Sequence, residues 1–171
     1  MKIILLGYMA SGKSTIGRLL AEEKKLDFID LDEYIEEQEE KTISDIFKDD
    51  GEIYFRLKEH EYLKELLEKE ESFILSLGGG TPCYANNMEL INSFDNVSSY
   101  YLKATPKTIK DRLLLQRDKR PLVAKLSDEE LHEFIAKHLF ERSFYYEQAS
   151  NKIIIDDKSI EEVAKELLLL L

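Results

Sequence analysis

Short apolar runs alternate with longer helix-like segments along the chain. Five runs have the length of a buried strand, at residues 2–6, 26–30, 73–77, 98–103 and 152–156. Strands that alternate with helices are typical of α/β folds built on a mostly parallel sheet. The pattern therefore predicts a layered α/β domain.

Three helices have recognisable start signals. Thr-Pro at 105–106 is typical of an N-cap residue followed by proline in the first turn. Residues 127–130 and 159–162 each place a serine three positions before a glutamate, which is capping-box spacing. We expect helices to begin at these three places.

Two segments are longer than a simple crossover between strands requires. Residues 31–70 hold two or three helices, and we expect a substrate-binding subdomain there, at about 31–62. The stretch 116–130 is polar and interrupted by Pro121, and we expect a lid, at about 113–127. No repeat or linker divides the chain, so we expect residues 1–171 to form one domain.

Composition and charge limit the partners. The 171 residues suffice for one domain with a full core, and 24 basic against 35 acidic residues give a net charge of −11. Such a surface repels nucleic acid and anionic membranes, so we expect neither as a partner. An anionic substrate then requires a local cluster of arginines.

Cysteine usage and the apolar runs bear on the compartment. A single cysteine, Cys83, excludes an internal disulfide and suits a reducing cytosol. No signal peptide is visible, and no apolar run is long enough to span a bilayer. We therefore expect a cytoplasmic protein, and no extended apolar patch argues against a monomer.

Residues 7–14 (GYMASGKS) lie between the first strand and a helix and complete the pattern G-x-x-x-x-G-K-[ST]. The glycines allow backbone amides to converge on phosphate oxygens, and the helix adds its positive N-terminus. We expect Lys13 to reach the β- and γ-phosphates, Ser14 to bind Mg²⁺ and Thr15 to help at the α-phosphate. The expected ATP-binding residues of this segment are Gly7, Ala10, Ser11, Gly12, Lys13, Ser14 and Thr15. The alternative is a glycine turn with a surface lysine.

Other P-loop classes lack their motifs in this chain. Neither D-x-x-G nor N-K-x-D of the GTPases is present, and the run at 73–77 leads into glycines instead of a Walker-B acid. The metal must therefore find an acid elsewhere, through water.

Asp30 and Asp32 end the second strand, at the sheet edge that carries the P-loop. At i and i+2 on an extended chain they point to the same side, where one can hold metal waters and the other an acceptor hydroxyl. The alternative is a pair of solvated acids at a helix start, with Asp32 capping a helix from Glu33.

Arg56 and the glycines 78–80 are further candidates on the acceptor side. Arg56 lies in a strongly helical context, where a lone arginine is usually surface charge. Three glycines after a strand cost backbone entropy, which favours close approach of a ligand over a simple tight turn.

Six motifs together resemble shikimate kinase in order and spacing. They are the P-loop at 7–21, DLD at 30–32, GEIYFRLKE at 51–59, the glycines at 78–80, RPL at 120–122 and ERSFYYEQA at 141–149. The resemblance implies a nucleoside-monophosphate-kinase-like P-loop fold with a five-stranded parallel sheet in the order 2-3-1-4-5. It also implies transfer of the γ-phosphate of ATP to the 3-hydroxyl of shikimate, with Mg²⁺, on the route to chorismate and the aromatic amino acids.

The resemblance assigns the acceptor side. Asp32 is similar to the acid that binds the ring hydroxyls and accepts a proton, and Arg56 and Arg142 to the pair that clamps the shikimate carboxylate. Gly78, Gly79 and Gly80 are similar to the glycines whose backbone donates beside the substrate.

The resemblance also assigns the phosphate and adenine sides. Arg120 is similar to the lid arginine that covers the transferring phosphate and, with Lys13, is expected to act in catalysis and ATP binding. Asp30 is similar to the acid near the hydrated metal, Arg112 to the arginine that stacks on adenine, and residues 157–158 to the loop on the other adenine face. Ala10 departs from relatives, which often have a third glycine there.

Four residues are interpreted as structural. His60, His132 and His138 lack metal-ligand spacing, and we expect surface histidines. Cys83 has no base partner nearby in sequence, and we expect a bystander.

The leading hypothesis is a shikimate kinase. The second is another P-loop metabolite kinase acting on gluconate or a nucleoside monophosphate. The third is a non-catalytic nucleotide-binding module, which leaves the paired acids and arginines unexplained.

Overall fold

Strand β1 is the central strand of a parallel sheet in the computed structural model, which describes residues 1–115 and 125–171. The strands are β1 (Lys2–Leu6), β2 (Asp27–Asp30), β3 (Phe73–Ser76), β4 (Val97–Lys103) and β5 (Asn151–Ile154). Their order β2-β3-β1-β4-β5, with every pairing parallel, confirms the predicted sheet. All of β1 is buried, as expected for a strand covered on both faces.

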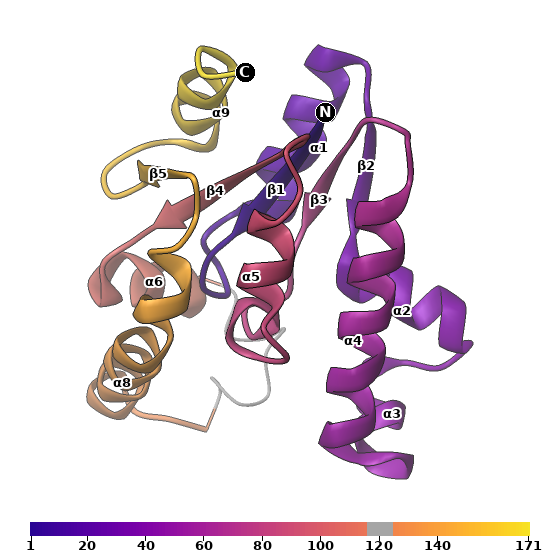
Figure 1. The fold of residues 1–171 in the computed structure, drawn as a ribbon. Coiled ribbons are helices and arrows are strands. Elements are labelled where there is room, and N and C mark those ends of the chain that lie inside the picture. Colours follow the sequence, from indigo (N-terminus) through magenta and orange to yellow (C-terminus); the bar gives the residue numbers. More distant parts are fainter. Residues whose placement is uncertain (116–124) are drawn as a thin grey trace.

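Helices cover both faces of the sheet (Figure 1). They are α1 (Lys13–Lys24), α2 (Leu31–Glu39), α3 (Ile43–Asp49), α4 (Gly51–Glu68), α5 (Asn87–Asn92), α6 (Pro106–Leu114), α8 (Asp128–Tyr146) and α9 (Ile160–Leu168), with a short 3₁₀ helix η1 (Thr81–Cys83). Helix α1 packs on the sheet beside α9, and α5 packs on β4 beside α4. The carboxyl ends of the parallel strands therefore open between these layers, where an α/β sheet binds its ligands.

The three predicted helix starts are confirmed. Thr105 caps α6, with Pro106 in the first turn. Ser127 and Ser159 form complete capping boxes at the starts of α8 and α9. Each serine hydroxyl oxygen accepts from the backbone N–H of the glutamate three residues later, and the backbone N–H of the serine donates to that glutamate's carboxylate.

The insertion after β2 consists of helices. Helices α2 and α3 and the first two thirds of α4 occupy residues 31–62, and both shorter helices pack against α4. The predicted lid, about 113–127, lies mostly outside the described residues. Within residues 1–115 and 125–171, no helix combines the length and apolar character needed to cross a bilayer.

Candidate active site

The loop between β1 and α1 has the backbone that a phosphate cradle requires. Gly7 has φ 144° and Gly12 has φ 96°, in the region that favours glycine. A Cβ atom on Gly7 would also lie 2.8 Å from the carbonyl oxygen of Leu102, so the chain has no room for a side chain there. Ala10 adopts φ 61° although it carries a Cβ. The loop leads directly into the N-terminus of α1, which favours bound anions.

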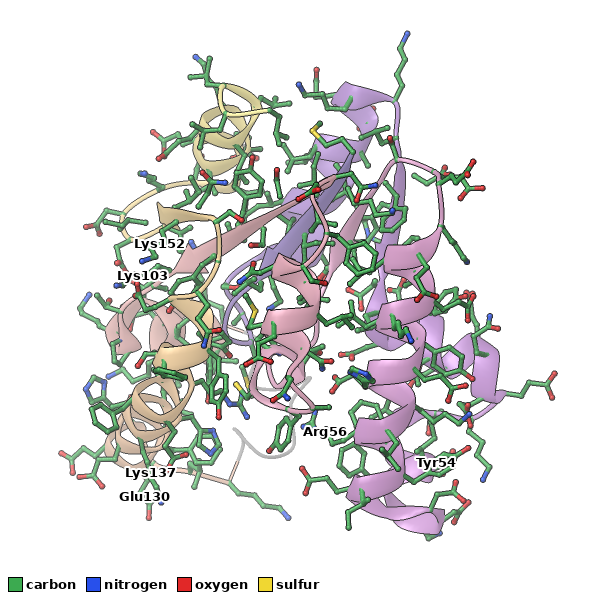
Figure 2. The ribbon with its side chains drawn as sticks, in the orientation of Figure 1. Tyr54, Arg56, Lys103, Glu130, Lys137 and Lys152 are labelled. Carbon is green, nitrogen blue, oxygen red and sulfur yellow. The ribbon has the colours of Figure 1, made fainter. Side chains whose placement is uncertain are left out.

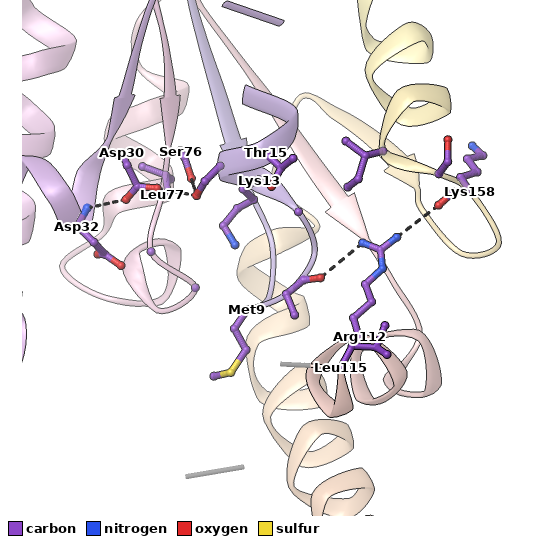
Figure 3. Close-up of a pocket in the computed structure, with 17 residues that line it drawn as sticks. Met9, Lys13, Thr15, Asp30, Asp32, Ser76, Leu77, Arg112, Leu115 and Lys158 are labelled. Carbon is purple, nitrogen blue, oxygen red and sulfur yellow. Dashed lines mark hydrogen bonds between the residues drawn. The ribbon is translucent and has the colours of Figure 1, made fainter. Parts of the chain in front are cut away.

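Lys13 is the cation of this loop, and only 8% of it is exposed. Its Nζ donates to the carbonyl oxygens of Gly7 at 2.9 Å and Tyr8 at 3.0 Å. Figure 3 shows Lys13 between Asp32 on one side and Arg112 on the other. The ammonium thus lies beside the backbone that would hold a polyphosphate.

Three side-chain oxygens gather where β2 and β3 end beside α1. The Ser14 hydroxyl donates to Asp30 Oδ2 at 2.7 Å and lies 3.4 Å from the Ser76 hydroxyl (Figure 3). Hydroxyl and carboxylate oxygens are the donors that Mg²⁺ prefers, so this group fits a hydrated magnesium ion. Ser76 is buried at the end of an apolar strand. The sequence did not predict it as a site residue, because it belongs to no polar motif.

Asp30, and not Asp32, caps helix α2. Asp30 Oδ1 accepts the backbone N–H of Asp32 at 3.1 Å, and the helix begins at Leu31. The alternative cap at Asp32 is therefore wrong, because the earlier carboxylate already satisfies the first free amide. The expected i, i+2 geometry is also wrong, since Asp32 is helical. The two acids still line one cleft, one from the strand end and one from the first helical turn.

Asp32 has an unusual acidity for an aspartate. Burial, which is the largest cause, and the carboxylates of Asp30 and Glu59 together raise its pKa from 3.8 to about 6, against the opposing charges of Lys13 and Arg56. The side chain is thus mostly ionised at pH 7 but binds a proton more readily than an exposed aspartate. Such a group suits general base catalysis.

Each of the three glycines after β3 lies against a different charged candidate. A Cβ atom would stand 2.9 Å from Asp32 Oδ1 at Gly78, 3.5 Å from Arg142 Nη1 at Gly79 and 2.8 Å from Arg56 Nη2 at Gly80. None has a positive φ angle, so Gly78 and Gly80 need glycine for space, whereas a Cβ atom at Gly79 would be in ordinary contact. The structure therefore brings the predicted acid and both predicted arginines to one short stretch of bare backbone.

Arg56 is held by neighbours that the sequence reading missed. Its Nη1 donates to Glu59 Oε2 at 2.8 Å, and its guanidinium lies 4.0 Å from the ring centre of Tyr84. Glu59 is almost fully buried and accepts a second hydrogen bond, from Thr81 Oγ1 at 2.6 Å. The spacing of Glu59, three residues after Arg56 on one helix, was a signal that could have found it. In Figure 2, Arg56 extends from α4 away from Tyr54, which binds Glu39 of α2.

Arg142 reaches the glycine stretch from α8. Its guanidinium lies 5.5 Å from the ring centre of Tyr8, and Tyr146 from the same helix donates to the Gly79 carbonyl oxygen at 2.5 Å. Tyr146 thus ties α8 to the glycines. Cys83 lies near both arginines, but burial raises the pKa of its thiol to about 11, which leaves little reactive thiolate at neutral pH.

Arg112 bridges the P-loop and the loop after β5. Its Nη1 donates to the Ser11 carbonyl oxygen at 3.1 Å. Figure 3 shows its contacts with the carbonyl oxygens of Ala10 and Lys158, each at 3.5 Å. Ser11 is buried, and its own hydroxyl finds no partner among the described residues. The predicted adenine-side residues therefore meet at one end of the phosphate cradle.

A cleft of about 660 Å³ connects these groups. Its lining runs from the β5–α9 loop and Arg112 across the P-loop to Asp32 and Gly79. Arg56, Arg142 and Gly80 adjoin it through the glycine stretch. Arg120 lies outside the described residues.

Two histidines differ from the expectation of a surface position. His60 and His138 are half-buried, with Nδ1 2.7 Å from Asn87 Oδ1 and 3.1 Å from the Tyr8 hydroxyl, respectively. Each lies on a helix face turned toward another segment, which the charged sequence around it concealed. His132 is exposed, as expected.

Comparison with known proteins decides the family. The shikimate kinase family model matches residues 9–171. The chain belongs to the shikimate kinase family. A shikimate kinase from Flavobacterium psychrophilum is 52% identical over 166 residues, which are 97% of this chain and 96% of the relative. The crystal structure of shikimate kinase from Bacteroides thetaiotaomicron matches with a TM-score of 0.89 and 36% identity, over 100% of this chain and 99% of that one. A shikimate kinase from Acinetobacter baumannii, solved in complex with shikimate, has a TM-score of 0.84 and 32% identity and covers 99% and 91% of the two chains.

This membership confirms the P-loop kinase fold and the ATP-dependent phosphorylation of shikimate that the motifs predicted. It favours shikimate over the alternative acceptors, gluconate and nucleoside monophosphates, and a kinase over a non-catalytic module. The roles of single residues in this shikimate kinase fold rest on the geometry above.

Proposed function

We propose that ATP and shikimate meet in the cleft at Lys13, each held by the groups at its own end. ATP lies on the P-loop, residues 7–15, with adenine beside Arg112 and the loop 157–160. The γ-phosphate lies near Lys13, whose charge offsets the negative charge that develops during transfer.

Shikimate binds against the glycine stretch, with its carboxylate between Arg56 and Arg142. Two guanidinium groups suit a planar carboxylate, because each can donate two parallel hydrogen bonds. The Nε of Arg56 lies 3.6 Å from Glu52 Oε1 and makes no hydrogen bond with the described residues. A protein with a net charge of −11 requires such a concentrated cationic pocket for an anionic substrate.

Asp32 orients the 3-hydroxyl and takes its proton. The hydroxyl oxygen bonds to the γ-phosphorus, the bond from that phosphorus to the β–γ bridging oxygen breaks, and ADP leaves with the electron pair. The pKa of about 6 makes Asp32 a stronger base than an exposed aspartate while keeping it ionised at neutral pH.

The Ser14 hydroxyl and, through water, Asp30 would hold Mg²⁺. The ion supplies charge neutralisation at the phosphate oxygens when bound. The 2.7 Å hydrogen bond between the two side chains keeps both oxygens at the start of α1.

The remaining roles extend the same scheme. Arg120 acts on the transferring phosphate from the lid at about 113–127, and residues 31–62 serve as the substrate-binding subdomain. We further propose that the protein is a cytoplasmic monomer and binds neither nucleic acid nor membranes. The net charge of −11 supports the absence of these anionic partners. Light scattering at working concentration tests the monomer.

One observation carries this assignment: Asp32, Arg142 and Arg56 face three consecutive glycines at the end of the P-loop cleft. The test is coupled ADP release with shikimate, gluconate and nucleoside monophosphates. We expect shikimate-dependent turnover that is lost in Lys13→Met and Asp32→Asn, and a raised KM for shikimate in Arg56→Ala. Arg18→Ala, which removes an exposed arginine paired with Glu33, is the matched control. An unchanged KM for shikimate in Arg56→Ala would refute the carboxylate clamp.

A further inference from the structure

A hydrogen-bonded chain leads from His60 to Arg56 through buried polar groups. His60 Nδ1 and Asn87 Oδ1 are 2.7 Å apart, and Asn87 Nδ2 donates to the Thr81 carbonyl oxygen at 2.8 Å. Thr81 Oγ1 donates to Glu59 at 2.6 Å, and Glu59 accepts from Arg56 at 2.8 Å. The hydrogen-bonded chain runs from α4 to α5, then to η1 and back to α4. Helices α4 and α5 lie side by side in Figure 1.

Its donors and acceptors are fixed by chemistry. Asn87 uses its amide hydrogen on the Thr81 carbonyl, so its oxygen accepts and His60 Nδ1 carries the hydrogen. Asn87 and Thr81 are fully buried and Glu59 is 1% exposed, so a lost partner cannot be replaced by bulk water. The position of each member therefore depends on the next.

Asn87 also closes a strained turn. Its backbone N–H donates to the Tyr84 carbonyl oxygen at 3.0 Å. Between them, Ala85 has φ 50° and Asn86 has φ 55°, a left-handed conformation that residues with a Cβ adopt at a cost. The Asn87 side chain also anchors the start of the segment 81–87, because its Nδ2 donates to the Thr81 carbonyl oxygen. The turn then presents the ring of Tyr84 to the guanidinium of Arg56 at 4.0 Å.

We propose that His60 and Asn87 are positioning residues for Arg56. They hold the turn from Thr81 to Asn87, which fixes the guanidinium twice: through Thr81 and Glu59 at Nη1, and through Tyr84 at its face. Pre-organisation of this kind lowers the entropy cost of binding a carboxylate. The inference rests on the proposed function, because it gives Arg56 the shikimate carboxylate as its ligand.

The first test changes His60, which is half-buried and outside the cleft. His60→Leu removes the donor to Asn87, whereas His60→Asn places an amide nitrogen near the former Nδ1. We expect His60→Leu to raise the KM for shikimate about fivefold to tenfold, the size of one lost hydrogen bond, with the KM for ATP within about twofold. His60→Asn restores most of the loss, and His132→Leu on α8 is the exposed control. An equal rise in both KM values, or equal impairment in His60→Asn, overturns the proposal.

The second test uses Tyr84, whose partly exposed ring can be changed without a buried cavity. We expect Tyr84→Leu to raise the KM for shikimate severalfold and Tyr84→Phe, which keeps the ring, to leave it within about twofold. These two Tyr84 variants test the positioning of Arg56 if His60→Leu does not fold. An unchanged KM in Tyr84→Leu counts against the proposal.

A substrate analogue separates this proposal from the clamp itself. With the carboxamide of shikimate, the carboxylate charge is absent, so the His60→Leu penalty should disappear. If Arg56→Ala raises the KM for shikimate but His60→Leu and Tyr84→Leu do not, the positioning role fails and the clamp stands. If Arg56→Ala itself has no effect, the proposed function fails.

Discussion

The guanidinium of Arg56 lies so close to Gly80 that a Cβ atom on this glycine would stand 2.8 Å from Nη2. The guanidinium cannot retreat freely, because Glu59 holds Nη1 and Tyr84 covers its face. A side chain at position 80 would therefore displace the cation that we assign to the substrate carboxylate.

Gly80→Ala tests this contact. We expect the KM for shikimate to rise by about tenfold or more, since displacement of a binding group by about 1 Å is costly, and the stability to fall by about 1–3 kcal/mol from overpacking. Gly79→Ala is the matched control for stability, because its added Cβ would have no atom nearer than 3.5 Å. Thermal unfolding and steady-state kinetics measure both effects, and equal stability loss in the two variants would contradict the contact.

Asp32→Asn should make the unliganded protein more stable at alkaline pH. The pKa of Asp32 is raised from 3.8 to about 6, so the folded state binds this proton more tightly than the unfolded state does. That contribution is full below about pH 4 and is lost as the pH rises through about 6, which costs about 3 kcal/mol at pH 8. We expect the Asp32→Asn variant to recover this amount in urea unfolding at pH 8 and almost none at pH 4. Asp95→Asn, at an exposed loop position, is the control.

The same carboxyl group should control the pH dependence of turnover. Because the proposed base must be ionised, kcat/KM for shikimate should fall about tenfold for each pH unit below about 6. A profile that is flat down to pH 5 would argue that Asp32 orients the hydroxyl without taking its proton.

Asp30→Asn separates the two roles of Asp30. Asparagine is as good an N-cap as aspartate, so α2 should keep its start and the melting temperature should change little. The charge near the proposed metal is lost, so the Mg²⁺ concentration for half-maximal activity should rise about tenfold. Removal of Mg²⁺ with EDTA should abolish turnover in both proteins. A large loss of stability with an unchanged Mg²⁺ requirement would reverse this assignment.

Ala10→Gly should stabilise the free protein slightly. Ala10 has φ 61°, which costs a residue with a Cβ about 1–2 kcal/mol relative to glycine, partly offset by the greater freedom of glycine in the unfolded chain. We expect a net gain of up to about 1 kcal/mol in urea unfolding. Ala21→Gly inside α1 should instead lose about 1 kcal/mol, and a loss at both positions would disprove strain at Ala10.

Local patterns in the sequence were enough to predict most of the fold. The P-loop at 7–14 and the serine caps at 127 and 159 depend on residues a few positions apart, so their spacing sufficed. The glycines at 78–80 were also recognised, although the side chains that crowd them come from α2, α4 and α8.

What the sequence concealed depends on distant contacts or on competition between neighbours. The contact between Glu59 and Thr81 spans 22 residues and that between His60 and Asn87 spans 27, so no local pattern marked these two contacts. Asp30 and Asp32 were recognised as a pair, but which of them starts the helix depended on which carboxylate reached the first amide.

The lysine of the P-loop already has two oxygen partners within its own loop, the carbonyls of Gly7 and Tyr8. Arrival of a nucleotide at this ammonium is consequently an exchange of partners, in which phosphate oxygens compete with peptide oxygens for the same three hydrogens. Discrimination between a triphosphate and a diphosphate at Lys13 then depends on the difference between two sets of hydrogen bonds. Release of ADP is assisted because the Lys13 ammonium can again donate to the carbonyl oxygens of its own loop.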